Sequence, residues 1–223
     1  MEKLPVGSPK RVIKAAYGSV TGFYPFKGQD SVQFESTLER DFLKRLETFD
    51  SVITVISQPV VIDYITAKGN PSTYTPDFRV VRKSYPYVLR PDCIVEVKPN
   101  KFLRKNFKEL KPKFKAAIRY CKENGMVFHL MDEFKIKDTR WKNANFLRRY
   151  KKMNFEAEES EWIIRSLKLM GMTTFGRLLD HLYKSKDKRN IGKSHLWHLI
   201  ANGRVYCDKS LPLDSFSELW VKS

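Results

Sequence analysis

The sequence predicts a mixed α/β domain followed by a small C-terminal domain of winged-helix type. Three observations predict this fold class. Helical periodicity near the N-terminus gives way to β-branched extended segments, a long basic helical segment then leads to one more apolar strand, and three short amphipathic segments with a final extended stretch follow. A chain of 223 residues is long enough for one main core and a second, smaller one.

The first predicted helix lies near residues 36–49. Leu38, Phe42 and Leu46 recur at helical spacing, and Leu43 widens this apolar stripe. The preceding residues, 1–30, are expected to form a basic arm followed by irregular or short extended structure.

Strands are predicted after this helix. Residues 51–65 are β-branched and bounded by turn residues, so we expect one or two strands around Gln58 and the proline that follows it. Two further strands are predicted at residues 73–81 and 92–99, and residues 82–91 connect them.

A long basic helix is predicted between the last two strands. Residues 103–125 have helical periodicity, Pro112 interrupts or starts the helix, and Asn124-Gly125 ends it. The apolar residues 126–132 then predict a further strand. That strand can return beside its neighbour through a helical crossover, which predicts a mixed sheet flanked by helices.

The C-terminal part changes character. Three short amphipathic helices are predicted at residues 158–171, 174–184 and 194–203. A hairpin or wing is predicted after them, at residues 204–221. Short helices followed by a wing are typical of a winged-helix module. We expect the domain boundary near residue 154, where charge runs replace apolar periodicity, giving domains 1–154 and 155–223.

The charge balance indicates a polyanionic partner, and nucleic acid is the commonest one. The chain has 42 Lys and Arg against 25 Asp and Glu, a net charge of +17. Residues 1–154 hold 31 basic and 16 acidic residues, whereas residues 155–223 hold 11 and 9. Contact with the polyanion is therefore expected in the N-terminal domain.

The sequence indicates a reduced cytosolic compartment without membrane insertion. No stretch reaches the roughly 18 apolar residues of a membrane span, and the first residues lack the apolar region of a signal peptide. Cys93, Cys121 and Cys207 are odd in number and widely separated, which argues against a disulfide framework.

Two acidic residues and a lysine have the chemistry for phosphodiester cleavage. That reaction needs an activated water and neutralisation of charge on the phosphate, which carboxylate-bound Mg²⁺ can supply beside a lysine. Asp77 lies in one extended segment, and Glu96 and Lys98 lie on the same face of the next. The carbonyl oxygen of Val97 is expected to be an additional ligand.

Two Pro-Asp pairs precede this Glu-x-Lys motif, and geometry separates them. Asp92 is four residues before Glu96 on the same strand, so the two lie roughly 13 Å apart. Asp77 belongs to a separate strand and can lie beside Glu96 at the strand spacing of about 5 Å. We therefore expect Asp77 to be the metal ligand and Asp92 to end the loop.

Four ordered motifs carry a resemblance to a known family. Asp77 with Glu96-x-Lys98 is similar to the PD-(D/E)xK nuclease superfamily. The segments FESTLERDFLKRLE, SQPVVIDY, YTPDFRV and IVEVKP together resemble the TnsA family, the endonuclease subunits of targeted cut-and-paste DNA transposons. The resemblance covers about residues 15–135.

The resemblance implies a restriction-endonuclease-like fold and a metal-dependent site. Its catalytic positions fall on Glu39, Asp77, Glu96 and Lys98. The implied ligands of Mg²⁺ or Mn²⁺ are Glu39, Asp77 and Glu96, to which the strand geometry adds the backbone carbonyl of Val97.

The resemblance also implies a function and its partners. Members of the family nick the 5′ (non-transferred) strands at transposon ends in double-stranded DNA. A TnsB-like transposase of the DDE type cuts and joins the 3′ ends, and a TnsC-like AAA+ ATPase regulator contacts the C-terminal domain. The expected location is the bacterial cytoplasm, at the nucleoid when assembled.

Three points remain open in the sequence. Ser36 and Glu39 also fit a capping box, which their spacing alone favours, whereas the family match favours the metal site. Gln58 fits the edge of the site or a structural position beside a proline, and we favour the structural one. The basic residues of 101–122 fit a solvated helix face or, as we expect for Lys101, Arg104, Lys105 and Lys108, phosphate contacts.

Two other functions compete with transposon-end cleavage. One is a non-catalytic DNA-binding adaptor that recruits the ATPase, and the other is a stand-alone restriction or repair nuclease. The complete set of Glu39, Asp77, Glu96 and Lys98 favours catalysis over the adaptor.

Overall fold

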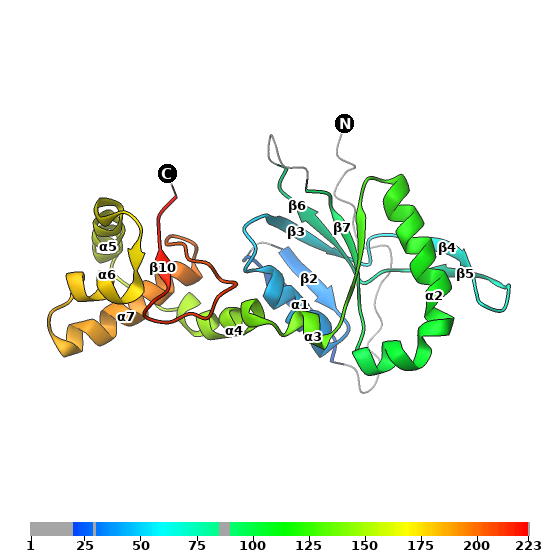
Figure 1. Cartoon of the computed structure of the whole chain (residues 1–223), viewed down its shortest axis with the longest axis horizontal. Coiled ribbons are helices and arrows are strands. Elements are labelled where there is room, and N and C mark those ends of the chain that lie inside the picture. Colours follow the sequence, from blue (N-terminus) through cyan, green and yellow to red (C-terminus); the bar gives the residue numbers. More distant parts are fainter. Residues whose placement is uncertain (1–19, 29, 85–89, 223) are drawn as a thin grey trace. The chain divides into compact units, whose positions relative to one another are not determined.

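A computed structural model describes residues 20–28, 30–84 and 90–222. The chain divides into two compact units, one ending at Lys137 and the other beginning at Asp138. Of the segment 1–30, expected to begin as a basic arm, residues 1–19 and 29 lie outside the described residues, as do residues 85–89 of the connection at 82–91. Figure 1 shows the elements of both units.

A four-stranded mixed sheet forms the centre of the first unit. Its strands in spatial order are β3 (Val52–Ser57), β6 (Phe78–Arg82), β7 (Cys93–Val97) and β8 (Val127–Met131). β3, β6 and β7 pair antiparallel, and β8 pairs parallel to β7. A parallel pair needs a long crossover, which α2 (Asn100–Glu123) provides. The predicted mixed sheet with a helical return is confirmed.

Helices α1 (Thr37–Leu46) and α2 pack on opposite faces of this sheet (Figure 1). The α1 residue Phe42 stacks on Phe78 of β6 with 5.7 Å between ring centroids. The α2 residue Phe114 lies 5.9 Å from Phe128 of β8. Phe78 pairs with Val95 of β7, and Phe128 pairs with Ile94 of the same strand. Paired residues share a face and neighbours along a strand alternate, so Phe78 and Phe128 lie on opposite faces.

Helix α2 runs through Pro112, where the sequence predicts an interruption or a start. A proline inside a helix removes one backbone hydrogen bond and favours a bend. Burial of Leu103 before it and of Phe114 and Ala117 after it compensates for this loss. The helix is continuous but changes direction along its length (Figure 1).

Two hairpins complete the first unit, together with the short helix α3 (Glu133–Ile136). The hairpin strands are β1 (Gly22–Phe26) with β2 (Asp30–Phe34), and β4 (Ile62–Ile65) with β5 (Pro71–Tyr74). The predicted strand at 73–81 is therefore two strands, β5 and β6, separated by Thr75, Pro76 and Asp77. Pro76 lacks the N–H that a ladder needs, which accounts for the break.

The second unit is helical with a small strand pair. Its elements are α4 (Thr139–Lys151), α5 (Ala157–Met170), β9 (Thr173–Thr174), α6 (Phe175–Leu182), α7 (Lys186–Ala201) and β10 (Glu218–Leu219). Trp197 is 2% exposed at the centre of its core. The ring of Phe175 stacks on Trp197 at 4.1 Å, and Phe146 meets the same ring edge-on at 5.1 Å.

The division between the units precedes α4, whereas the sequence places it near residue 154, after that helix. Leu147 belongs to the core of the second unit, and Phe146 packs against that core. The side-chain amide of Asn143 donates hydrogen bonds to the carbonyls of Lys209 and Leu211 at 2.9 and 2.6 Å. Helix α4 is rich in charged and polar residues, so its sequence does not show which face is buried. The charge runs therefore place the boundary after this helix and not before it.

Helix α7 begins at Lys186, eight residues before the predicted start of the third C-terminal helix. Asn190 and Gly192 weaken the helical pattern in the sequence. Gly192 is needed at its place, because a β-carbon there would lie 2.1 Å from the ring of Tyr183.

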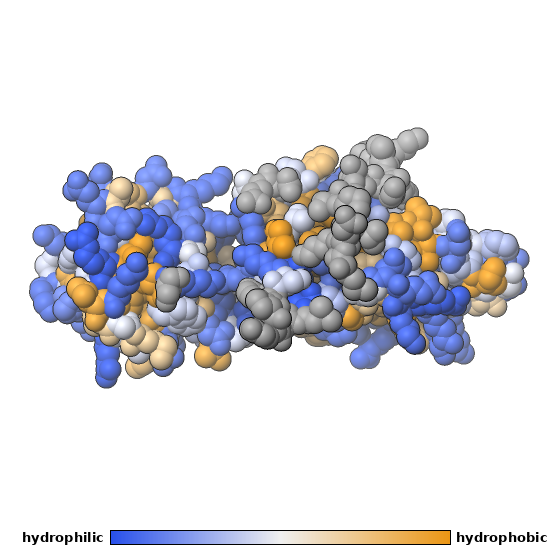
Figure 2. Space-filling model, turned by 90° about the horizontal axis from the view of Figure 1, so that it is seen from above, coloured by the Kyte–Doolittle hydropathy of each residue, from blue (hydrophilic) through white to orange (hydrophobic). Residues whose placement is uncertain are grey.

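The surface carries many charged side chains. On the face shown in Figure 2, hydrophilic side chains cover most of the area and hydrophobic ones form separate patches. Within the described ranges, no helix is long and apolar enough to cross a lipid bilayer.

Candidate active site

Asp77 and Glu96 come together because β6 and β7 are adjacent antiparallel strands. Asp77 directly precedes β6, whereas Glu96 lies near the end of β7. Phe78 pairs with Val95, so the beginning of β6 meets the end of β7. Oδ2 of Asp77 accepts a hydrogen bond from the backbone N–H of Val97 at 2.7 Å, which fixes the carboxylate at this sheet end.

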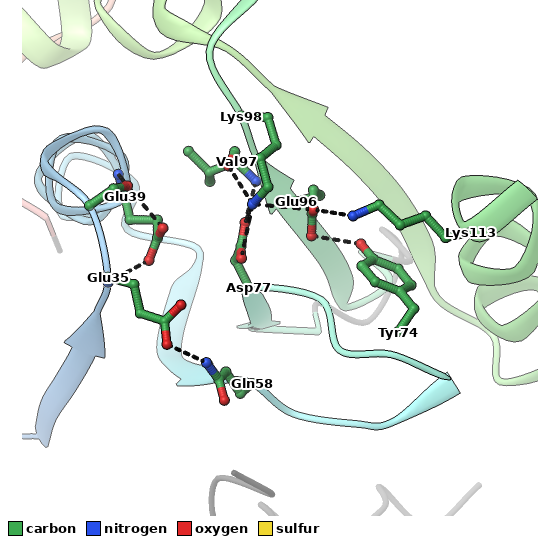
Figure 3. A network of polar contacts seen from close by, with 10 residues as sticks. Glu35, Glu39, Gln58, Tyr74, Asp77, Glu96, Val97, Lys98 and Lys113 are labelled. Carbon is green, nitrogen blue, oxygen red and sulfur yellow. Dashed lines mark hydrogen bonds and ion pairs between the residues drawn. The ribbon is translucent and has the colours of Figure 1, made fainter. Parts of the chain in front are cut away.

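Oxygen atoms of three residues converge on the ammonium group of Lys98 (Figure 3). Its Nζ lies 3.1 Å from Oδ2 of Asp77 and 3.3 Å from Oε1 of Glu96. The same atom donates a hydrogen bond to the carbonyl oxygen of Val97 at 3.1 Å. Two carboxylates and a carbonyl are ligands that Mg²⁺ and Mn²⁺ prefer, and here they already surround one cation. The donor set therefore fits a divalent metal ion.

The electrostatics of this cluster also favour a cation. Burial raises the pKa of Asp77 to about 7, and the negative charges of Glu96 and Glu39 add to the rise. Burial alone would lower the pKa of Lys98, but the charges of Asp77 and Glu96 raise it above its ordinary value. Carboxylates with too little compensating charge are stabilised by a bound cation.

Glu96 has two further partners that the sequence analysis missed. Its Oε1 also lies 3.1 Å from Nζ of Lys113, and its Oε2 accepts a hydrogen bond from the hydroxyl of Tyr74 at 2.7 Å. Glu96 is 1% exposed, so these protein donors surround a nearly buried carboxylate. The sequence held one indication for Lys113. It directly precedes the apolar Phe114 in a helix that is expected to flank the sheet, so its side chain begins close to the sheet.

Glu39 takes part in the N-terminal cap of α1, in a variant of the capping box that its spacing predicts. Its backbone N–H donates to Oγ of Ser36 at 3.1 Å, and Oε1 accepts from that hydroxyl at 2.9 Å. Oε2 accepts from the backbone N–H of Glu35 at 2.8 Å. Figure 3 shows the side chain extending from α1 toward the Asp77–Lys98 pair. Burial raises the pKa of Glu39 above its ordinary value.

The cluster does not contain three acidic side chains in mutual contact. Among the residues with described positions, no three His, Cys, Asp or Glu side chains form a group that could hold a metal ion by themselves. The structure brings together Asp77, Glu96, Lys98 and the Val97 carbonyl, whereas the oxygens of Glu39 bind its own helix cap.

Gln58 occupies a strained position beside these residues. Its φ of 47° lies in the left-handed region that non-glycine residues rarely adopt. Its backbone N–H donates to the carbonyl of Asp77 at 2.9 Å, and its side-chain amide donates to Oε1 of Glu35 at 3.1 Å. These contacts support the structural interpretation, because Gln58 links the end of β3 to the segment that carries Asp77.

Asp92 directly precedes β7, apart from the cluster. Its Oδ2 accepts a hydrogen bond from Arg79 at 2.8 Å, and its Oδ1 accepts one from the backbone N–H of Arg82 at 3.1 Å. Asp92 therefore ties the loop before β7 to β6, the structural position expected for the second Pro-Asp pair.

The four basic residues predicted to contact phosphate lie in the first turns of α2. This helix begins two residues after Lys98. All four side chains are exposed, and they are Lys101, Arg104, Lys105 and Lys108. They follow the cluster directly in the sequence, so the phosphate contacts expected for them stay a prediction.

Comparison with known families gives two matches that follow one another along the chain. Residues 49–133 match the TnsA-like endonuclease N-terminal family, and residues 135–208 match the TnsA endonuclease C-terminal family. No curated protein matches the chain. The N-terminal match contains Asp77, Glu96 and Lys98, whereas Glu39 precedes it.

The two matches meet next to the division between the units at Lys137 and Asp138. The mixed sheet between α1 and α2 fits the restriction-endonuclease-like fold of this family. The order of both matches and the acidic cluster in the first lead to one conclusion: the chain belongs to the TnsA family of transposon endonucleases.

Proposed function

We propose that this protein is a divalent-metal-dependent endonuclease that nicks the 5′ (non-transferred) strands at transposon ends during cut-and-paste transposition. The observation that supports it best is the convergence of Asp77, Glu96 and the Val97 carbonyl on one cationic atom, Nζ of Lys98. A divalent ion held by such oxygens neutralises phosphate charge and lowers the pKa of bound water.

Each residue of the cluster has a distinct task in this proposal. Asp77, Glu96 and the Val97 carbonyl hold Mg²⁺ or Mn²⁺, and the N–H of Val97 keeps the Asp77 carboxylate in place. Glu39 completes the ligand set, because a carboxylate oxygen that accepts one hydrogen bond retains a second lone pair. Lys98 positions the attacking water and stabilises charge on the phosphate.

Double-stranded DNA is the proposed substrate, bound along the N-terminal unit. The exposed side chains of Lys101, Arg104, Lys105 and Lys108 contact backbone phosphates beside the cleaved bond. Such contacts give affinity without reading sequence, so partner proteins place the cut at the transposon end.

The second unit is proposed as a winged-helix-like module that docks a TnsC-like AAA+ ATPase, in an assembly with a TnsB-like DDE transposase. Support comes from the pairing of β9 with β10 and from the bridge between Tyr206 and Trp220, which form a small sheet beside α6 and α7. Leu169, Met172 and Phe216 are 84%, 68% and 80% exposed, so these apolar side chains are available for contact with a partner protein. The bacterial cytoplasm is the proposed location.

Substitution of Asp77 tests the nuclease. We expect Asp77→Asn to abolish nicking of DNA with strand-specific labels at a transposon end, in Mg²⁺ and with the partner proteins present. DNA affinity measured in Ca²⁺ should be retained. The matched control is Asp63→Asn on β4, an exposed carboxylate outside the cluster. Undiminished nicking by Asp77→Asn would remove the proposed site.

A strand map tests the finer claim. Cleavage restricted to the 5′ strand at the transposon end supports the proposal. Equal cleavage of DNA that lacks such ends, without partner proteins, would instead indicate a stand-alone nuclease.

A further inference from the structure

Glu96 is held on two sides, and only one of them faces Asp77. Lys98 approaches from the side of Asp77, with Nζ 3.3 Å from Oε1. Tyr74 donates to Oε2 at 2.7 Å, and Lys113 lies 3.1 Å from Oε1. Figure 3 shows Tyr74 and Lys113 together on the side of Glu96 that points away from Asp77.

We propose that Tyr74 and Lys113 are positioning residues that hold the Glu96 carboxylate in its metal-binding orientation. This inference rests on the proposed function, in which Glu96 is a metal ligand. It assigns different tasks to the two lysines around one oxygen atom. Lys98 occupies the point where the ligand oxygens converge, whereas Lys113 lies behind Glu96 and stays in place when a metal ion is bound.

Burial makes these two donors important for Glu96. Glu96 as a whole is 1% exposed, so water has little access to replace a lost hydrogen bond. The Tyr74 hydroxyl carries no net charge, so it orients Oε2 without repelling a divalent cation. Partners that orient a metal-binding carboxylate typically change metal affinity or activity by about 10–100-fold when removed.

Tyr74 and Lys113 also support each other. The ammonium of Lys113 lies 4.6 Å from the centre of the Tyr74 ring, within the range of a cation–π interaction. Tyr74, Lys113 and Glu96 therefore form a closed set of three contacts, and loss of one member loosens the other two.

The fold holds this set rigidly from two elements outside the central sheet. Tyr74 ends β5 and is 5% exposed in a cluster with Ile62 of β4 and with Ala116 and Ala117 of α2. Lys113 reaches Glu96 because α2 continues past Pro112. The β4–β5 hairpin and the middle of α2 thus determine the orientation of a residue on β7.

Removal of the Tyr74 hydroxyl is the sharpest test. We expect Tyr74→Phe to weaken Mn²⁺ binding about tenfold or more, measured on the full chain by electron paramagnetic resonance of free Mn²⁺. The control is Tyr64→Phe, a tyrosine of the same hairpin packed against the same cluster. Both variants keep their rings, so both should unfold within a few degrees of the wild-type protein. Mn²⁺ affinity for Tyr74→Phe within twofold of the control would overturn the proposal.

The role of Lys113 is tested by measuring the nicking rate at saturating Mn²⁺. We expect Lys113→Met to lower the nicking rate about tenfold or more, while Lys111→Met, an exposed lysine of the same helix, leaves it unchanged. Lys113→Arg should restore part of the rate by keeping the charge. If Lys113→Met weakens DNA binding but leaves the nicking rate of bound DNA unchanged, then Lys113 contacts phosphate instead.

A double substitution tests whether both residues act through Glu96. The double variant with Tyr74→Phe and Lys113→Met should lower the nicking rate by less than the product of the two single reductions. In a Glu96→Gln background, Tyr74→Phe should leave Mn²⁺ affinity unchanged. If Asp77→Asn and Glu96→Gln still nick, the proposed function itself fails. If these lose nicking while Tyr74→Phe and Lys113→Met match their controls, only this inference fails.

Discussion

The ammonium group of Lys98 lies 3.1 Å from Oδ2 of Asp77, across the junction between two antiparallel strands. The same ammonium touches Glu96 and the Val97 carbonyl, so it occupies the point at which the oxygens of the cluster meet. A metal ion bound there must displace the lysine side chain from this point. In the proposed mechanism, Lys98 and the metal ion therefore compete for the same oxygens, although the proposed catalysis needs both.

This competition predicts opposite effects of Lys98→Met on binding and on catalysis. Mn²⁺ affinity should rise about tenfold or more, because a positive charge in contact with the ligands is removed. The nicking rate should fall by about 10² or more, because no ammonium remains beside the attacked phosphate. Calorimetric Mn²⁺ titration and a nicking time course measure the two effects. Lys111→Met, an exposed lysine of α2 outside the cluster, is the control for lost charge. Weaker Mn²⁺ binding by Lys98→Met would contradict this account of the site.

Asp92 is predicted to act on stability and not on cleavage. Asp92→Ala removes a carboxylate that accepts from Arg79 and from the backbone of Arg82 at 2.8 and 3.1 Å. The first unit should lose about 1–3 kcal/mol of unfolding free energy, measured by urea denaturation followed by circular dichroism. Nicking per folded molecule should match the wild-type protein. A rate loss as large as that of Asp77→Asn would place both Pro-Asp pairs in the active site.

The pH dependence of the second unit should follow His195. This residue is fully buried, and its Nε2 lies 2.7 Å from Oγ of Ser160. Burial lowers the pKa of His195 below its ordinary value of 6.5, and the nearby charges of His198 and Arg204 lower it further, whereas Glu159 opposes the shift.

The sign of the effect follows from this direction. Above about pH 6.5, His195 is neutral in both the folded and the unfolded state. As the pH falls below that value, the unfolded state binds a proton first, so stability is lost down to the folded-state pKa. A lower midpoint temperature is therefore expected at pH 5 than at pH 7, and His195→Gln should reduce this difference.

Tryptophan fluorescence is the appropriate measurement, because all four tryptophans of the chain, at 141, 162, 197 and 220, belong to the second unit. An unchanged pH dependence in His195→Gln would assign the effect to other titratable groups.

The division between the units predicts which fragment folds. A fragment of residues 138–223 should fold cooperatively, whereas one of residues 155–223 should not. The shorter fragment lacks Phe146 and Leu147, which pack into the core around Trp197, and Asn143, which bonds the segment before β10. Near-ultraviolet circular dichroism and thermal melts compare the two. A cooperative melt of residues 155–223 would show that α4 is dispensable and that the boundary near residue 154 holds.

The order of the elements and the basic outline of the site could be predicted from the sequence. Periodicity identifies α1 and the strands around Gln58, because burial of one face imposes a local repeat. Period-two alternation correctly places Glu96 and Lys98 on one side of β7, and the rise along a strand separates Asp92 from Glu96.

Only the tertiary structure decided which additional groups meet those residues. Tyr74 and Lys113 are 39 positions apart, and no local pattern relates them to each other or to Glu96. Pro112 is a helix breaker by local rules, yet burial of the turns on both sides carries α2 through it. Local periodicity reports which face of an element is buried, whereas the partner that covers this face is set by contacts between distant segments.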